Sequence, residues 1–189
     1  MRNVYAAIQA LLLGAALGFA GGAGAQSPEP VGEPDEQVEP EPEDPSATGD
    51  AWVDAQLADI GRYGKRYRDA FIDELVRYRE APRALVEALL DERGWEPGDV
   101  YFACSLARVT GRSCRFVVDR RGQPPAESWN ALAAGLGAGA GSPEFTRLKR
   151  GVVHSYQRWA RPLELDADLA EVFPDHGKPA PPAAADDGS

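Results

Sequence analysis

The chain has 189 residues and a formal net charge of −10. This length suits one modest domain with flanking segments and argues against two full domains. The charge is unevenly placed, because residues 26–50 carry nine acids and no base, whereas residues 51–175 carry 19 acids and 18 bases. The negative charge therefore belongs mainly to the segment before the domain, and the domain itself is close to neutral.

The first 25 residues have the features of a signal peptide. A basic start at Arg2 precedes an apolar run over residues 4–20, and Ala23-Gly24-Ala25 matches the A-x-A pattern that signal peptidase cleaves. The alternative is an uncleaved anchor, since residues 4–25 could almost span a bilayer. The polar Gln9 and the many small residues favour cleavage. We therefore expect no transmembrane anchor in the mature protein, and a periplasmic or secreted location.

Two segments are predicted to be disordered. Residues 26–50 contain six prolines among their acids, and residues 176–189 are rich in proline, alanine and polar side chains. Such compositions offer too little apolar surface to offset the entropy lost on ordering. Residues 26–50 are thus interpreted as an acidic spacer and residues 176–189 as a tail, which leaves residues 51–175 as the folded domain.

Residues 51–175 are predicted to form an all-α domain, because their apolar residues recur at steps of three and four and no stretch alternates as a strand would. Residues 53–78 are expected to form two helices, with a break where Gly61 and Gly64 weaken the pattern, and one kinked helix is the alternative. Trp129 and Trp159 lie on apolar stripes and are expected to be buried. The predicted fold is a compact bundle of about six or seven short helices. After residues 53–78, further helices are expected at residues 82–93, 100–109, 113–120, 129–136 and 143–161, and a final short turn is expected at residues 168–173.

The two cysteines, Cys104 and Cys114, are an even pair at modest spacing in a protein expected to be exported. An oxidising compartment favours a disulfide between them. The alternative is that both are small buried residues, since a disulfide requires Cα atoms within about 7 Å. Neither the cysteines nor the two histidines have the paired spacing of a zinc site, so no metal ligands are predicted.

A short segment over residues 103–119 resembles the bacterial helix-turn-helix signature. Ala107, Gly111 and Val117 match its small residue, its turn glycine and its aliphatic residue. The resemblance implies a recognition helix over residues 113–120, with four bases available for DNA: Arg112, Arg115, Arg120 and Arg121. An exported protein meets little chromosomal DNA, so no nucleic-acid partner is expected, and the motif is interpreted as a helix-packing unit.

Catalytic residues are not predicted. His154 neighbours Ser155, but adjacent residues on a helix point about 100° apart and do not form a nucleophile–base pair. His176 stands at the start of the predicted tail. The chain contains no G-x-S-x-G, Walker or H-E-x-x-H motif, and no cofactor is expected. An enzyme of an unrecognised type remains an alternative.

The helix expected after Pro143 carries two opposite stripes. Its apolar stripe consists of Phe145, Leu148, Val152, Tyr156 and Trp159. Its basic stripe, displaced by two residues, consists of Arg147, Arg150, His154, Arg158 and Arg161. The basic stripe is either an ordinary solvated face or a surface that binds an anionic partner. The anionic partners considered are lipid headgroups, envelope polyanions, another protein and the acidic spacer itself.

In organisation and composition the whole chain resembles the uncharacterised exported small helical proteins of GC-rich Gram-negative bacteria. That resemblance implies no activity. Together with the features above, it favours a non-enzymatic interaction or accessory module of the cell envelope. The alternatives are a peripheral binder of anionic lipids or polyanions, an enzyme, and a helix-turn-helix DNA-binding protein.

Cleavage after Ala25 would give a mature protein that begins at Gln26. Mass spectrometry of the protein isolated from the producing cell should find that N-terminus, free or cyclised to pyroglutamate. A full-length product in the cytoplasm would contradict the signal peptide, and would reopen DNA binding by residues 103–119.

Overall fold

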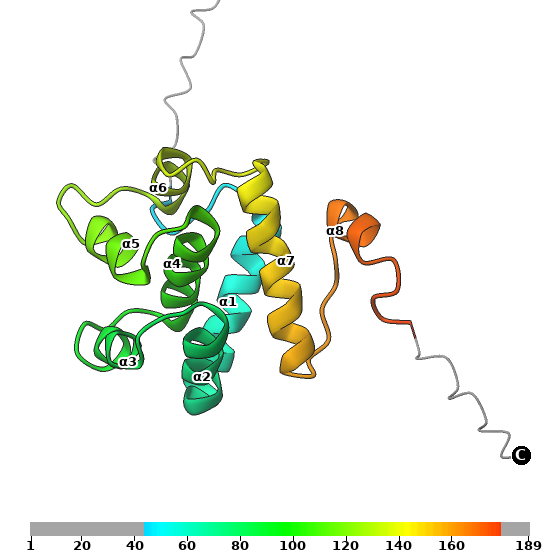
Figure 1. Cartoon of the computed structure of the whole chain (residues 1–189), viewed down its shortest axis with the longest axis horizontal. Helices are drawn as coiled ribbons and strands as arrows, with labels where there is room; N and C mark the ends of the chain where they lie inside the picture. The colour runs from blue at the N-terminus through cyan, green and yellow to red at the C-terminus, as the bar shows by residue number, and fades with distance from the viewer. Residues whose placement is uncertain (1–43, 179–189) are drawn as a thin grey trace, which may run out of the picture. The chain divides into compact units, whose positions relative to one another are not determined.

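The computed structural model describes residues 44–178. The predicted signal peptide and most of the predicted spacer and tail lie outside these residues. The described residues form eight helices and no strand, which confirms the all-α prediction (Figure 1). The helices are α1 (Ala51–Arg66), α2 (Arg68–Tyr78), α3 (Arg83–Asp91), α4 (Pro97–Thr110), α5 (Cys114–Arg121), α6 (Trp129–Gly135), α7 (Pro143–Arg158) and α8 (Ala167–Val172).

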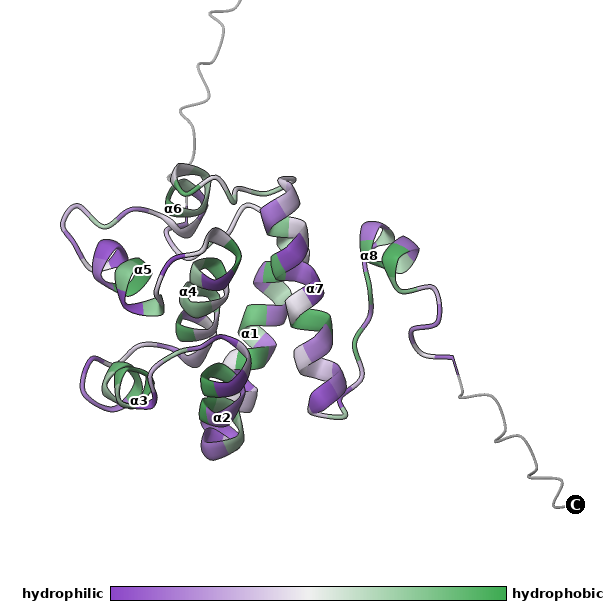
Figure 2. Cartoon of the chain, viewed as in Figure 1, coloured by the Kyte–Doolittle hydropathy of each residue, from purple (hydrophilic) through white to green (hydrophobic). Residues whose placement is uncertain are grey.

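Helix α4 is the central element of the domain. It packs against α1, α3, α5 and α7 (Figure 1). Ten of its 14 residues are buried, including the fully enclosed Tyr101 and Phe102. Helix α7, by contrast, is amphipathic, with hydrophobic and hydrophilic residues on different sides of its axis (Figure 2). The positions of the outer helices are therefore set by how each one packs on α4 or on its neighbours.

The prediction of two helices is confirmed, but the break lies at Tyr67, because the first helix continues through Gly61 and Gly64 as far as Arg66. The glycines allow α1 to cross α4 at short range. A Cβ atom on Gly64 would lie 2.6 Å from the Cβ of Pro97, and one on Gly98 would lie 2.5 Å from the carbonyl oxygen of Leu57. Packing against α4 thus outweighs the low helix propensity of glycine.

The structured region begins before Ala51, because part of the predicted spacer packs on the domain. The carbonyl of Pro45 accepts a hydrogen bond from the backbone N–H of Trp129 at 3.1 Å. Thr48 is fully buried, and its hydroxyl donates to the carboxylate of Asp54 at 2.7 Å. The hydrogen bonds of the threonine and the local backbone hold this short stretch on the domain despite its acidic composition.

A single lysine of α7 holds the starts of two other helices. Lys149 is buried, and its ammonium pairs with Asp50 at 3.0 Å and with Asp166. Asp50 is the N-cap of α1 and Asp166 is the N-cap of α8. Burial lowers the pKa of Lys149, but the hydrogen bonds to the two carboxylates outweigh it, so its pKa lies above the ordinary value.

Of the two tryptophans predicted to be buried, the prediction is confirmed for Trp129 but not for Trp159. Trp129 is 1 % exposed, as expected. Trp159 is only partly buried and stacks on Tyr63, with ring centroids 4.3 Å apart. Phe116, although it is a large apolar residue, is exposed beneath the guanidinium of Arg112. The inner face of α5 is formed instead by its two buried valines.

Replacing Gly98 by alanine should destabilise the domain by about 1–3 kcal/mol, because the added methyl group would meet backbone rather than a movable side chain. The matched control is Gly135→Ala in α6, where the nearest atom is the mobile end of Arg120 at 3.4 Å. Chemical denaturation of the wild type and both variants measures the effect. A Gly98→Ala variant as stable as Gly135→Ala would contradict the close crossing of α1 and α4.

Candidate functional site

The described residues offer two candidate surfaces and one buried polar cluster. The predicted cysteine pair, which lies beneath the first surface region, does form a disulfide. Cys104 and Cys114 are bonded, with their Cα atoms 4.5 Å apart, and both are buried. The bond joins the middle of α4 to the first residue of α5, and it is compatible with an exported protein.

The helix-turn-helix-like segment corresponds to α4, α5 and the turn between them. Gly111 has a φ of +66°, which favours glycine, and Ala107 and Val117 are buried where the two helices pack. Two of the four bases assigned to DNA contact bind within the domain. Arg120 forms a bidentate pair with Glu127 at 3.0 and 3.1 Å, and Arg121 lies 5.0 Å above the ring of Trp129. Arg112 and Arg115 are exposed.

The predicted basic stripe of α7 is divided by the fold. Arg158 donates to the buried carboxylate of Glu74, with an Nε–Oε2 distance of 2.9 Å, and Arg161 pairs with Asp59 at 2.8 Å. The expectation that Arg158 points away from the fold is therefore wrong. The C-terminal end of α7 lies beside α2. A side chain on the side of α7 opposite its apolar stripe therefore contacts α2 at this end instead of solvent.

Asp59 shows the strength of these internal contacts. Partial burial alone would raise its pKa, but hydrogen bonds from Arg161 and Tyr156 outweigh burial and hold the pKa below the ordinary value. The same contact, together with burial, raises the pKa of Tyr156. Arg161 thus serves as a link between α1 and the end of α7, and it contributes little as a free surface charge.

A buried polar cluster joins α2, α4 and α7. Ser155 donates to Glu74 at 2.6 Å, and its hydroxyl lies 2.8 Å from that of Tyr101. Arg79 reaches both hydroxyls, at 3.0 Å for Ser155 and 2.5 Å for Tyr101. A serine beside a carboxylate suggests nucleophilic chemistry, but Ser155 is 0 % exposed and none of the clefts found in residues 44–178 is lined by this cluster.

The histidines do not join this cluster. Nδ1 of His154 donates to the amide oxygen Oε1 of Gln157 at 3.1 Å, and the ring of His154 packs edge-on against Phe173. The imidazole of His176 lies 2.9 Å from the carbonyl oxygen of Leu163. His154 belongs to α7 and its side chain is exposed there, whereas His176 follows α8 and is half-buried.

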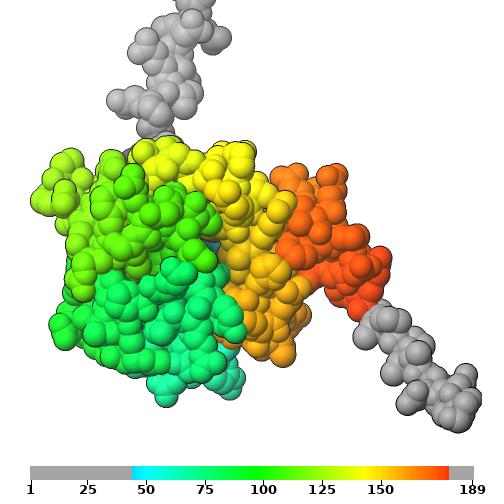
Figure 3. All heavy atoms as spheres, viewed as in Figure 1, coloured from blue at the N-terminus to red at the C-terminus, as the bar shows by residue number. Residues whose placement is uncertain are grey.

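The remaining bases define a surface at the meeting of three helices. Arg147 pairs with Glu144 at 2.8 Å, and its guanidinium also lies 3.5 Å from the carbonyl oxygen of Val109, at the end of α4. Helices α4, α5 and α7 share one face of the domain (Figure 3). We call this the basic surface, and it consists of Arg112, Arg115, Arg147, Arg150 and His154. Among the described residues, Arg112, Arg115 and Arg150 have no carboxylate within 4.0 Å.

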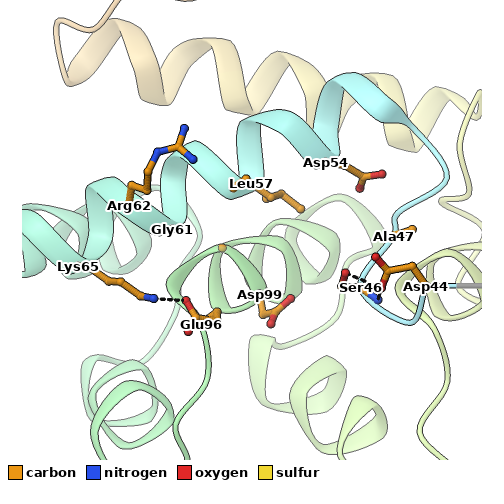
Figure 4. A pocket seen from close by; sticks show the side chains of 12 residues that line it. Asp44, Ser46, Ala47, Asp54, Leu57, Gly61, Arg62, Lys65, Glu96 and Asp99 are labelled. Atoms are coloured by element: carbon orange, nitrogen blue, oxygen red, sulfur yellow. Dashed lines mark hydrogen bonds and ion pairs between the residues drawn. The ribbon is translucent and has the colours of Figure 1, made fainter.

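The second surface is a cleft of about 350 Å³ between α1 and the start of α4 (Figure 4). Lys65 and Glu96 pair across it at 2.7 Å. Asp54 is held by Thr48, and Asp99 accepts the indole N–H of Trp129 at 2.7 Å. Sequence reasoning did not identify this cleft, since its walls come from α1, α4 and the segment before α1 and no local motif connects them.

No protein-family model, curated protein or solved structure matches the chain. No helix within residues 44–178 has both the length and the apolar character needed to cross a membrane. Across the same residues, no group of three histidine, cysteine or acidic side chains is arranged to hold a metal ion. The chemistry of the two surfaces therefore has to be argued from their own residues.

Replacing Arg158 by glutamine should lower the free energy of unfolding by about 3 kcal/mol, because Glu74 would keep a buried charge without its partner. The control is Arg150→Gln on the same helix, which removes the same charge from an exposed position and should change stability by less than about 0.5 kcal/mol. Denaturant melts of both variants give the comparison. Equal stability of the two variants would show that Glu74 does not need Arg158.

Proposed function

We propose that the protein is an exported, non-enzymatic binding module of the bacterial cell envelope, and that the basic surface docks it onto an anionic partner. Export is supported by the signal-peptide features of residues 1–25 and by the disulfide. The observation that carries the docking proposal is the set of three exposed arginines, Arg112, Arg115 and Arg150, with no carboxylate within 4.0 Å among the described residues.

Outside the basic surface, many exposed bases are paired with acids. Several exposed bases on the first three helices form ion pairs with neighbouring acids, as Lys65 does with Glu96 and Arg68 does with Asp91, whereas Arg66 and Arg77 have no carboxylate within 4.0 Å among the described residues. Such pairs leave little net field at the surface. A group of like charges without acids repels itself, and a partner that brings negative charge relieves that repulsion. The basic surface is thus suited to phosphate or carboxylate groups on a lipid or a polymer.

The helices that carry the basic surface are fixed to one another. The disulfide joins α4 to α5, and the hydroxyls of Tyr101 and Ser155, 2.8 Å apart, link α4 to α7. A rigid arrangement lets several weak contacts act together without a further loss of conformational freedom. This matters because each exposed charge pair contributes only about 0.2–1 kcal/mol.

The test compares two triple variants of the mature chain that remove the same charge. Arg112→Gln/Arg115→Gln/Arg150→Gln should bind vesicles of mixed phosphatidylcholine and phosphatidylglycerol about tenfold more weakly than the wild type at low salt. Arg66→Gln/Arg77→Gln/Arg83→Gln, with exposed positions on α1, α2 and α3, should bind as the wild type does. Sedimentation of the vesicles measures binding, and polyphosphate in solution replaces the vesicles in a second arm.

Binding by the wild type should weaken as salt rises, since screening shortens the range of charge interactions to about 10 Å at 0.1 M. Vesicle binding without polyphosphate binding would assign the surface to lipids, and the reverse would assign it to polymers. Equal losses in both triple variants, or no binding by the wild type to either probe at low salt, would show that the basic surface is an ordinary solvated face.

A further inference from the structure

A groove runs along the loop between α3 and α4. One cleft of about 310 Å³ is lined by Trp95, Asp99, Arg121 and Trp129. A second cleft of about 310 Å³, between α1, the end of α3 and the start of α4, also uses Trp95 as a wall. The α1–α4 cleft shares Glu96 with both of them. Because neighbouring clefts have walls in common, we treat them together as the Trp95 groove.

Trp95 divides the groove and is fixed in place there. Its backbone N–H donates to the carbonyl of Leu89 at 2.9 Å, and its ring meets that of Trp129 edge-on, with centroids 6.2 Å apart. The side chain is only partly buried. Its indole N–H donates to no group in the described part of the chain. Trp95 therefore has a partly exposed ring, with the guanidinium of Arg93 5.6 Å from its centroid, and an indole N–H without a partner among the described residues.

Opposite charges face the first cleft without pairing. Asp99 accepts the indole N–H of Trp129 through Oδ1, which leaves Oδ2 without a partner among residues 44–178. Arg121 lies over the face of the same indole and donates through Nη2 to the carbonyl of Pro45 at 3.4 Å, while its Nε is buried without a partner. The two side chains do not form an ion pair within 4.0 Å. The carboxylate of Asp99 at the edge of the Trp129 indole and the guanidinium of Arg121 over its face are thus not paired with each other.

The geometry points to a neutral oligosaccharide as the ligand of the Trp95 groove. A sugar hydroxyl can donate to Asp99 while another accepts from Arg121, and the apolar C–H face of the ring can lie against Trp95. A charged or zwitterionic ligand would lose more hydration free energy on entering a site whose own charges sum to nearly zero. Adjoining clefts on both sides of Trp95 favour a ligand of more than one sugar unit.

The proposal is independent of the basic surface, and the experiment separates the two. Isothermal titration calorimetry of the mature chain uses two neutral probes, cellotetraose and N-acetylchitotetraose. At least one should bind saturably with a Kd of about 1 mM or tighter. Trp95→Ala and Asp99→Asn should each weaken binding by at least about tenfold, whereas Trp95→Phe should keep part of it because the aromatic face is retained.

The matched control is the Arg112→Gln/Arg115→Gln/Arg150→Gln variant, which should bind the oligosaccharide as the wild type does. Asn at position 99 can still accept the Trp129 N–H, so this variant should fold even if Trp95→Ala does not. Circular dichroism verifies folding of each variant. Full binding by folded Asp99→Asn and Trp95→Ala variants would overturn the proposal, as would the absence of saturable binding of either probe by the wild type. The zwitterion glycylglycine is titrated as a third probe, and stronger binding of glycylglycine than of the oligosaccharides would also overturn the proposal.

Discussion

The orientation of α7 depends on a buried polar cluster that contains two guanidinium groups and one carboxylate. Arg158 and the hydroxyl of Ser155 both donate to Glu74, and Arg79 donates to five acceptors, among them Ser105 and the carbonyl of Gly151. Buried charges are tolerated when each donor has an acceptor, and they are costly when one partner is removed. The cluster therefore fixes the rotation and height of α7 against α2 and α4. That orientation leaves the N-terminal half of the basic stripe outside and turns its C-terminal end inward.

A different contact sets the position of the Trp95 groove. Helices α1 and α4 approach so closely that Gly98 has no room for a side chain, and the start of α4 is thereby held beside the middle of α1. The loop that carries Trp95 leads directly into this crossing. Lys149 completes the arrangement at the other end of α1, since it pairs with the N-cap aspartates of α1 and α8. The two candidate surfaces thus rest on separate sets of contacts, one polar and one steric.

The helices, the disulfide and the basic stripe could be predicted because they depend on local spacing. The three- and four-residue period identified α7 and its two faces, and two cysteines in a chain predicted to be exported identified the bond between α4 and α5. Periodicity states which residues share a face of one helix, but not which neighbour that face meets, and for this reason Arg158 was placed on the outside. The role of Gly61 and Gly64 was missed for a related reason, since only the partner helix shows that a missing side chain is needed. The groove was missed because Asp99, Arg121 and Trp129 are brought together by tertiary packing alone.

Helix α5 connects the two surfaces. It has only eight residues, which is too short for a helix to be stable in water by itself, so its position depends on tertiary contacts. The disulfide holds its first residue, and Val117 and Val118 pack its inner side on the core. Arg115 stands near its start on the basic surface, while Arg121 at its end lies over Trp129 in the groove. The covalent bond between α4 and α5 therefore positions one charge of each proposed site. Both proposed sites are therefore expected to need the disulfide-bonded form of the domain.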